Sequence, residues 1–224
     1  MNLRIDDIKQ RIKNDFGSYT IGDGFIYKKT ANEFIKIEGD FKCIINICPV
    51  SWSSSYSVNM KLRISQKRVE DILEKILGKQ RHRLTFHEDM LETIYYSPDG
   101  RKIVKGESLG LWFSTDNDVY TKLQSLKTYY TEIAKPYFSK FTSLETMDDF
   151  INSPPFEHSP AYVGAFTNAR CMKGLIIAKL VKNPNYDKLV AIYDEVIKRT
   201  LSDVQPDSIT NYNKVKEYLK QNSI

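Results

Sequence analysis

The spacing of apolar residues changes along the chain, and this change limits the architectures that the sequence can adopt. Residues 56–64 alternate between apolar and polar side chains, which is the period of a strand with one buried face. After Asp116 the apolar residues instead recur every three or four positions, which is the helical period. Because the strand-like segments precede the helical ones, the sequence predicts an α+β fold.

The first half is predicted to hold an N-terminal helix and an antiparallel sheet with one inserted helix. Apolar spacing indicates the first helix at residues 3–16, ended by Gly17. Short strands separated by turns follow at 25–27, 34–37, 41–48 and 56–64. The isoleucine-rich strand at 41–48 is expected in the middle of the sheet, and Pro49 is expected to end it. Ser65 is predicted to cap the inserted helix, which ends at Gly78.

The second half is predicted to be helical, and the whole chain to be one domain over residues 1–224. A long helix after Asp116 should break or kink before Pro136, and Ser143 should open the next helix. Further helices are expected at 162–182, 184–201 and 209–221. A subdivision into a sheet-rich part, 1–115, and a helical part, 116–224, stays open at this point.

Composition narrows the setting in which such a chain works. It has 224 residues, a net charge of +5 and three cysteines, an odd number that fits no disulfide framework. The first residues lack the apolar run of a signal peptide, and no segment approaches the roughly 20 apolar residues of a membrane span. We therefore expect a soluble cytoplasmic protein without a membrane partner.

Several stretches resemble a family of uncharacterised bacterial proteins, domain of unknown function 4304. The similar residues are the run Gly24 to Lys29, the isoleucine-rich strand 44–47, the pair Ser51-Trp52, and the segment Ala134 to Phe138. The run Cys48-Pro49-Val50 stands where the family often has polar residues. The resemblance supplies no catalytic residues, and it implies a toxin-neutralising role of the immunity type.

No segment carries an assembled catalytic or metal-binding motif. His82 and His87 are five residues apart, as are Cys43 and Cys48, so in a strand each pair would point to opposite faces. Cys171 lies in an apolar helical segment, where a cysteine usually acts as a small hydrophobe. We therefore expect no cofactor, metal or catalytic set. The alternative is an enzyme whose site assembles from dispersed residues, namely His82, His87, Glu88 and Cys171.

One segment has an excess of charge. Residues 61–83 hold eight basic and three acidic side chains, which gives a local net charge of +5. Such a segment is usually a solvated helix face with pairs four residues apart, such as Asp71 with Lys75. A weak nucleic-acid-binding surface is the alternative, although binders of nucleic acid usually concentrate charge more strongly.

The loop from Ser51 to Tyr56 is the first candidate for an interaction site. A tryptophan flanked by serines suits an interface, and a core tryptophan folded under the sheet fits equally well. With the adjacent charge, the predicted interaction surface comprises Trp52, Tyr56, Lys61, Arg63, Lys67 and Arg68. We accordingly predict a non-enzymatic module that binds another protein, of the inhibitor or immunity type; the sequence sets no oligomeric state.

Overall fold

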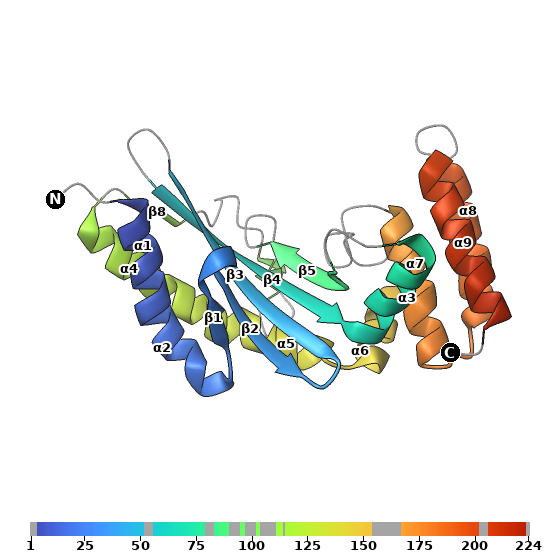
Figure 1. The fold of residues 1–224 in the computed structure, drawn as a ribbon, viewed down its shortest axis with the longest axis horizontal. Coiled ribbons are helices and arrows are strands. Elements are labelled where there is room, and N and C mark those ends of the chain that lie inside the picture. Colours follow the sequence, from blue (N-terminus) through green and yellow to red (C-terminus); the bar gives the residue numbers. More distant parts are fainter. Residues whose placement is uncertain are drawn as a thin grey trace. The chain divides into compact units, whose positions relative to one another are not determined.

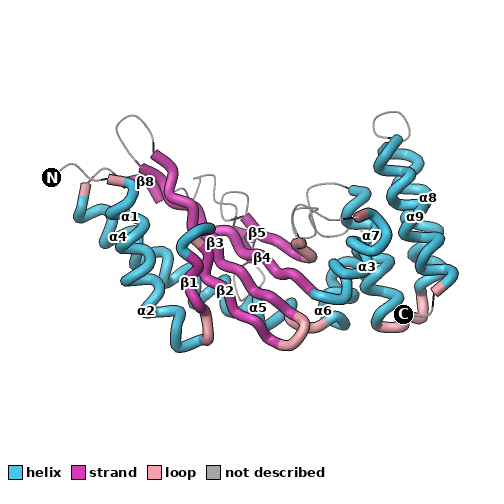
Figure 2. The backbone as a smooth tube through the Cα atoms, viewed as in Figure 1, coloured by secondary structure: helices cyan, strands magenta, loops and turns pink. Residues whose placement is uncertain are grey.

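The computed structural model describes residues 4–51, 56–78, 83–89, 95–96, 102–103, 111–113, 115–153, 167–201 and 206–222. It has the predicted α+β architecture: an N-terminal helix, an antiparallel sheet with an inserted helix, and a helical C-terminal half (Figures 1 and 2). The helical segments, in chain order, are α1 (Ile5–Arg11), the π-helix η1 (Ile12–Phe16), α2 (Gly17–Thr20), the 3-10 turns η2 (Ile21–Asp23) and η3 (Lys29–Ala31), α3 (Lys67–Leu77), α4 (Asp116–Tyr129), the π-helix η4 (Tyr130–Ala134), α5 (Lys135–Phe141), α6 (Leu144–Asn152), α7 (Thr167–Leu180), α8 (Tyr186–Leu201) and α9 (Pro206–Gln221).

The main sheet has the order β1-β2-β3-β4-β5, and β8 also pairs with β4. Its strands are β1 (Ile26–Lys28), β2 (Glu33–Glu38), β3 (Phe41–Ser51), β4 (Tyr56–Gln66), β5 (Phe86–Asp89) and β8 (Leu111–Phe113), while β6 (Tyr95–Tyr96) and β7 (Lys102–Ile103) form a separate pair. The isoleucine-rich strand is central, and Ile44, Ile45 and Ile47 are buried. On β4 the predicted buried face is confirmed, because Val58, Met60, Leu62 and Ile64 are all buried, whereas the other face is half-buried at Lys61 and Arg63.

The chain divides into two compact units. Unit 1 comprises Met1–Glu38, Lys42–Arg63 and Glu88–Ser139, and unit 2 comprises Gly39–Phe41, Ile64–His87 and Lys140–Ile224. This division does not follow the possible boundary at residue 115. The helices from α4 to Ser139 belong with the sheet of unit 1, and α3 belongs with the C-terminal helices of unit 2.

The first helical segment runs past the glycine that was expected to end it. Gly17 has the helical φ of −62°, and the left-handed Gly24, at φ +85°, ends the helical region instead. Gly17 is needed for packing, because a Cβ atom there would lie 3.2 Å from the ring of Phe34. The segment Gly22 to Gly24 is therefore the end of the first helical region.

β3 also runs past its expected end, since Pro49 lies inside the strand. The backbone N–H of Ile47 points toward the β2 side of β3, where it donates to the carbonyl of Asn32 at 3.2 Å. Strand alternation points the nitrogen of Pro49 to the same side, but β2 begins only at Glu33. The missing N–H of the proline therefore breaks no ladder bond.

Two further helix boundaries show how local chemistry sets the fold. The cap of α3 is Gln66 and not Ser65, since the Gln66 side chain accepts from the N–H of Val69 at 2.9 Å. The predicted break before Pro136 takes the form of the π-helix η4, which is followed by α5 with Pro136 in its first turn. Ser143 caps α6 as predicted.

Candidate interaction surface

The helix-covered face of the sheet in unit 1 is a closed apolar layer. Phe16 contacts Phe34 of β2 and Tyr130 of η4, with ring centroids 5.3 and 5.7 Å apart. The Tyr130 hydroxyl donates to Asp23 at 2.6 Å, and Lys135 forms an ion pair with the same carboxylate at 2.8 Å. The bond to Lys135 is the main reason that the pKa of Asp23 is lowered. This layer fixes the sheet from one side.

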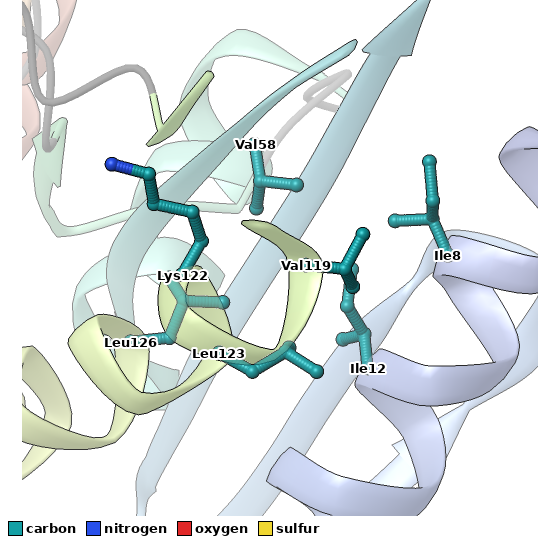
Figure 3. A pocket seen from close by; sticks show the side chains of 7 residues that line it. All are labelled: Ile8, Ile12, Val58, Val119, Lys122, Leu123 and Leu126. Atoms are coloured by element: carbon teal, nitrogen blue, oxygen red, sulfur yellow. The ribbon is translucent and has the colours of Figure 1, made fainter. Parts of the chain in front are cut away.

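A small apolar hollow lies in the same layer, between the N-terminal helix, β4 and α4 (Figure 3). It is lined by Ile8, Ile12, Val58, Val119, Lys122, Leu123 and Leu126. The figure shows the ammonium group of Lys122 directed away from the apolar side chains. The lining thus provides packing and no converging set of polar groups.

The opposite face of the sheet, which we call the outer face, carries exposed isoleucines. Ile26 of β1 stands opposite Ile35 of β2, so these residues share one face with Ile37, and of the three only Ile35 is buried. Ile26 and Ile37 are 72% and 73% exposed. Ile21, in the turn before β1, is also largely exposed. An isoleucine side chain that stays in water contributes no burial energy to the stability of the fold. Three such side chains near one sheet edge therefore require an explanation.

Basic side chains accompany these isoleucines on the outer face. Glu33 of β2, on the face of Ile35 and Ile37, forms an ion pair with Arg63 of β4 at 3.3 Å. Lys28 stands opposite Glu33 in the register and is exposed. By strand alternation Lys61 shares the face of Arg63. Lys42 belongs to the same face, because it alternates with the fully buried Cys43.

The structure separates the residues of the predicted interaction surface. Lys61 and Arg63 lie on the outer face, whereas Tyr56 alternates with them and belongs to the opposite face, with Val58. Lys67 and Arg68 are exposed in the first turn of α3, in unit 2. Trp52 lies outside the described residues. Within unit 1 the surface therefore retains its two strand cations and gains Lys28, Lys42 and the exposed isoleucines.

Sequence reasoning missed Ile26 and Ile37, although a signal was present. The run Phe34-Ile35-Lys36-Ile37 places apolar residues on both faces of one strand. On β2 both Phe34 and Ile35 are buried, whereas Ile37, two residues further along the face of Ile35, is exposed. The second apolar face of this strand is therefore covered at one position and exposed to water at the next.

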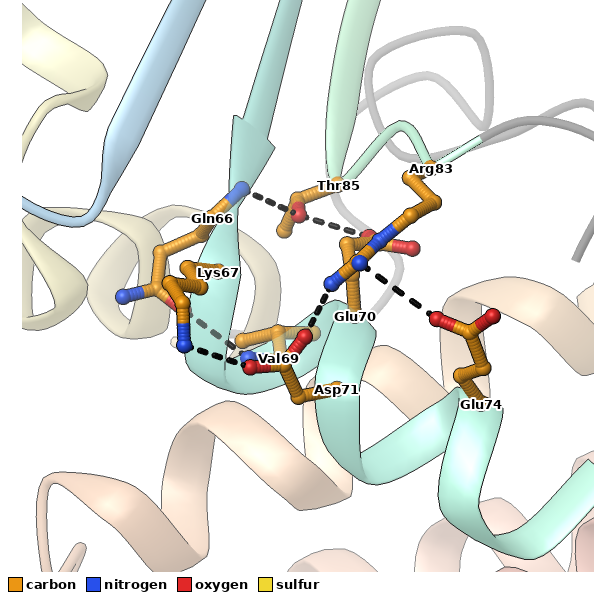
Figure 4. A network of polar contacts seen from close by, with 8 residues as sticks. All are labelled: Gln66, Lys67, Val69, Glu70, Asp71, Glu74, Arg83 and Thr85. Carbon is orange, nitrogen blue, oxygen red and sulfur yellow. Dashed lines mark hydrogen bonds and ion pairs between the residues drawn. The ribbon is translucent and has the colours of Figure 1, made fainter. Parts of the chain in front are cut away.

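In unit 2, much of the basic segment 61–83 is tied into a polar network around α3 (Figure 4). Asp71 pairs with Lys67 at 2.8 Å and with Arg83, and Arg83 also reaches Glu74 at 3.3 Å. The expected pair of Asp71 with Lys75 is not the one formed, because Lys75 lies over the ring of Tyr218 instead. The charge excess is thus divided between two units and partly neutralised within α3.

A second layer of this network is buried. Thr85 donates to Glu70 at 2.7 Å and accepts from the backbone N–H of Gln66 at 2.9 Å. Lys173 of α7 donates to the carbonyl of Leu84 and lies 4.0 Å from Glu70. Burial lowers the pKa of Lys173, and the Glu70 carboxylate opposes this shift. Glu70 is thus a buried carboxylate in the first turn of α3, which was not predicted from the sequence.

A neighbouring group of buried polar residues joins α6, α7 and α8. Asn152 donates to Asp148 at 2.6 Å and to the carbonyl of Gly174 at 3.1 Å, and it accepts from the hydroxyl of Tyr193. Asn183 donates to the other oxygen of Asp148. Burial raises the pKa of Asp148, and the two amide donors act against this shift. These bonds hold the helices of unit 2 in register.

The residues of the enzymatic alternative are only partly visible. Cys171 is fully buried in α7, and burial raises the pKa of its thiol to about 12, so it is not a thiolate at neutral pH. His82 lies outside the described residues, and the side chains of His87 and Glu88 are not described. Among the described residues, no group of three or more histidine, cysteine or carboxylate side chains is arranged to hold a metal ion.

Comparisons with known proteins add no relative. No family model matches the chain, and neither the curated proteins nor the solved structures contain a match. The resemblance to the family of uncharacterised bacterial proteins therefore stays a prediction. Within the described parts of the chain, no helix combines the length and apolar character needed to cross a membrane.

Proposed function

We propose that this protein is a non-enzymatic module that binds another protein through the outer face of the sheet in unit 1. The observation that carries the proposal is the exposure of Ile26 and Ile37 on one face of neighbouring strands. When a partner removes large exposed side chains of this kind from water, the complex is stabilised by about 25 cal/mol for each Å² of apolar surface that is buried.

The closed layer on the other side of the sheet supports this proposal. Phe16, Phe34 and Tyr130 fix β2 from beneath, so the outer face is presented by a backbone already held in place. A rigid surface loses little conformational entropy when a partner binds, which favours affinity. A module of the inhibitor or immunity type works in this way, by presenting a preformed surface.

The proposal includes a location in the cytoplasm of a bacterial cell. Cys43, Cys48 and Cys171 form no disulfide in the structure. Cysteines outside disulfides fit a reducing compartment, because an oxidising one favours disulfides.

Site-specific photocrosslinking tests the proposed function. A benzophenone amino acid is placed at residue 37 of the full chain, at residue 26 in a second variant, and at the exposed Lys198 of α8 as the matched control. We expect the same discrete adduct from positions 26 and 37 in cells, and its absence from position 198. Identical adduct patterns from all three positions would contradict the proposal, because they would show that the outer face has no special partner.

A further inference from the structure

We infer that the partner of the outer face is an acidic protein segment in which carboxylates flank a large apolar side chain. This inference rests on the proposed function and specifies the chemistry of its partner. It follows from the charge of the same face on strands β1 to β4, where four basic residues, Lys28, Lys42, Lys61 and Arg63, share it with one acidic residue, Glu33. Four minus one leaves a local charge of +3 beside the exposed isoleucines.

The charged residues of the outer face differ in exposure, and this divides them into an internal ion pair and a set of lysines. Arg63 is paired with Glu33, and their side chains are only 25% and 17% exposed, so this pair belongs to the surface itself. Lys28 is exposed, and Lys42 and Lys61 are half-buried. Lysines keep their charged end in water while their stems lie along apolar surface. Lys28 lies two residues from Ile26 on the same face of β1, and together the basic side chains of this face attract carboxylates of an incoming chain.

Nucleic acid is the less suitable ligand for this face. Phosphate-binding surfaces place aromatic rings or polar groups beside their cations, where bases stack or form hydrogen bonds. Among the described side chains, the exposed large ones of the outer face are aliphatic, such as Ile26 and Ile37, which offer neither. An apolar anchor within a polar rim is instead the usual anatomy of a protein interface.

Selection from a displayed library of random 12-residue peptides, made on the full chain at low salt, tests this inference. We expect enriched peptides to combine aspartate or glutamate with a large apolar residue. A synthetic copy of one such peptide should lose about tenfold in affinity, roughly 1.4 kcal/mol, for a variant with Lys28→Gln, Lys42→Gln and Lys61→Gln. Raising the salt concentration should also lower the affinity of the parent protein for this peptide.

The matched control neutralises three exposed lysines of unit 2, with Lys188→Gln, Lys198→Gln and Lys214→Gln. Both triple variants lower the net charge from +5 to +2, since three charges are removed in each. Equal loss of affinity in the two variants would overturn the inference, because it would reflect general attraction only. Unfolding curves for both variants establish that each is folded.

The outcomes distinguish the inference from the proposed function. Enriched peptides that are apolar and uncharged, yet fail to bind an Ile26→Asp/Ile37→Asp variant, overturn the acidic partner and leave the protein-binding module standing. Peptides that bind this variant and the parent with equal affinity overturn both the acidic partner and the proposed protein-binding function. An oligonucleotide that binds the parent and is lost on neutralising the outer-face lysines, with no peptide enriched, also overturns both, in favour of nucleic acid.

Discussion

Units 1 and 2 differ in their exceptions to the rule that apolar side chains are buried and charged side chains are exposed. Among the described residues, every exposed large hydrophobic residue belongs to unit 1; these are Tyr19, Ile21, Ile26, Ile37, Val50 and Tyr120. The buried charged residues Glu70, Asp148 and Arg170 all belong to unit 2. Unit 1 therefore leaves apolar surface in contact with water, whereas unit 2 uses buried polar bonds to fix the packing of its own helices.

The largest expected effect concerns the buried pair of Glu70 and Lys173. Glu70→Gln leaves the buried ammonium of Lys173 without its counter-charge, and we expect a loss of about 3 kcal/mol in the free energy of unfolding. A Glu70→Gln/Lys173→Met double variant should recover most of this loss, because the uncompensated charge is then gone. Denaturant unfolding of the full chain measures both.

The exposed ion pair of unit 1 supplies the comparison for this prediction. Asp7→Asn removes the partner of Arg4 at the surface, where water solvates the remaining charge, so little change is expected. If Glu70→Gln were as mild as Asp7→Asn, the buried network would not be what distinguishes unit 2.

Gly174→Ala should have the next largest effect. A Cβ atom at this position would lie 2.8 Å from the Tyr193 hydroxyl oxygen and 3.0 Å from Asn152 Oδ1, both part of the buried polar group. We expect a loss of about 1–3 kcal/mol, although alanine usually favours a helix over glycine. Gly22→Ala in unit 1 is the control, because nothing lies within 4 Å of its Cβ position. If Gly174→Ala instead raised the free energy of unfolding, the side chains of Tyr193 and Asn152 would be shown to move aside at little cost.

The two units also show what the sequence can and cannot predict. The alternation on β4, the central isoleucine strand, the end of α3 at Gly78 and the Ser143 cap follow from local spacing and were all predicted. The continuation of the chain through Pro49 and Gly17 was not predicted. At Pro49 the deciding feature is that β2 does not extend to face its nitrogen, and at Gly17 it is the nearby ring of Phe34. Both features involve residues that are distant in the sequence.

The candidate site divides along the same line. Lys61 and Arg63 were predicted from charge, since charge is visible in a sequence. Ile26 and Ile37 were missed, because exposure depends on which face of β2 is covered, and only the fold decides that. Glu70 was missed for the converse reason, since its partners Thr85 and Lys173 come from other elements.

Acid should affect a carboxylate of each unit in opposite directions, with effects smaller than those of the core substitutions. Bonds to Lys135 and Tyr130 lower the pKa of Asp23 below 3.8, so its contribution to stability is present above that pH and is lost as the pH falls through the folded pKa. Burial raises the pKa of Asp148 above 3.8, so it destabilises the fold at neutral pH and this penalty disappears as the pH falls toward 3.8.

Unfolding free energies measured across this pH range, for the parent and for Asp23→Asn and Asp148→Asn, separate the two contributions. Relative to the parent, Asp23→Asn should lose less stability on acidification, and Asp148→Asn should gain less. If both substitutions altered the pH dependence in the same direction, the assignment of one carboxylate to a favourable pair and the other to burial would be wrong.

The smallest effect is expected where the proposed function predicts the largest functional loss. Ile26→Thr and Ile37→Thr keep a β-branched side chain and remove apolar surface that already lies in water, so each should change the free energy of unfolding by no more than about 0.5 kcal/mol. Ile45→Thr, on the covered face of β3, should instead cost at least about 2 kcal/mol. If the outer-face variants were as destabilising as Ile45→Thr, folding alone would account for their isoleucines. Unchanged stability together with lost peptide binding would show that these side chains serve a partner, because nothing in the folding of unit 1 requires them.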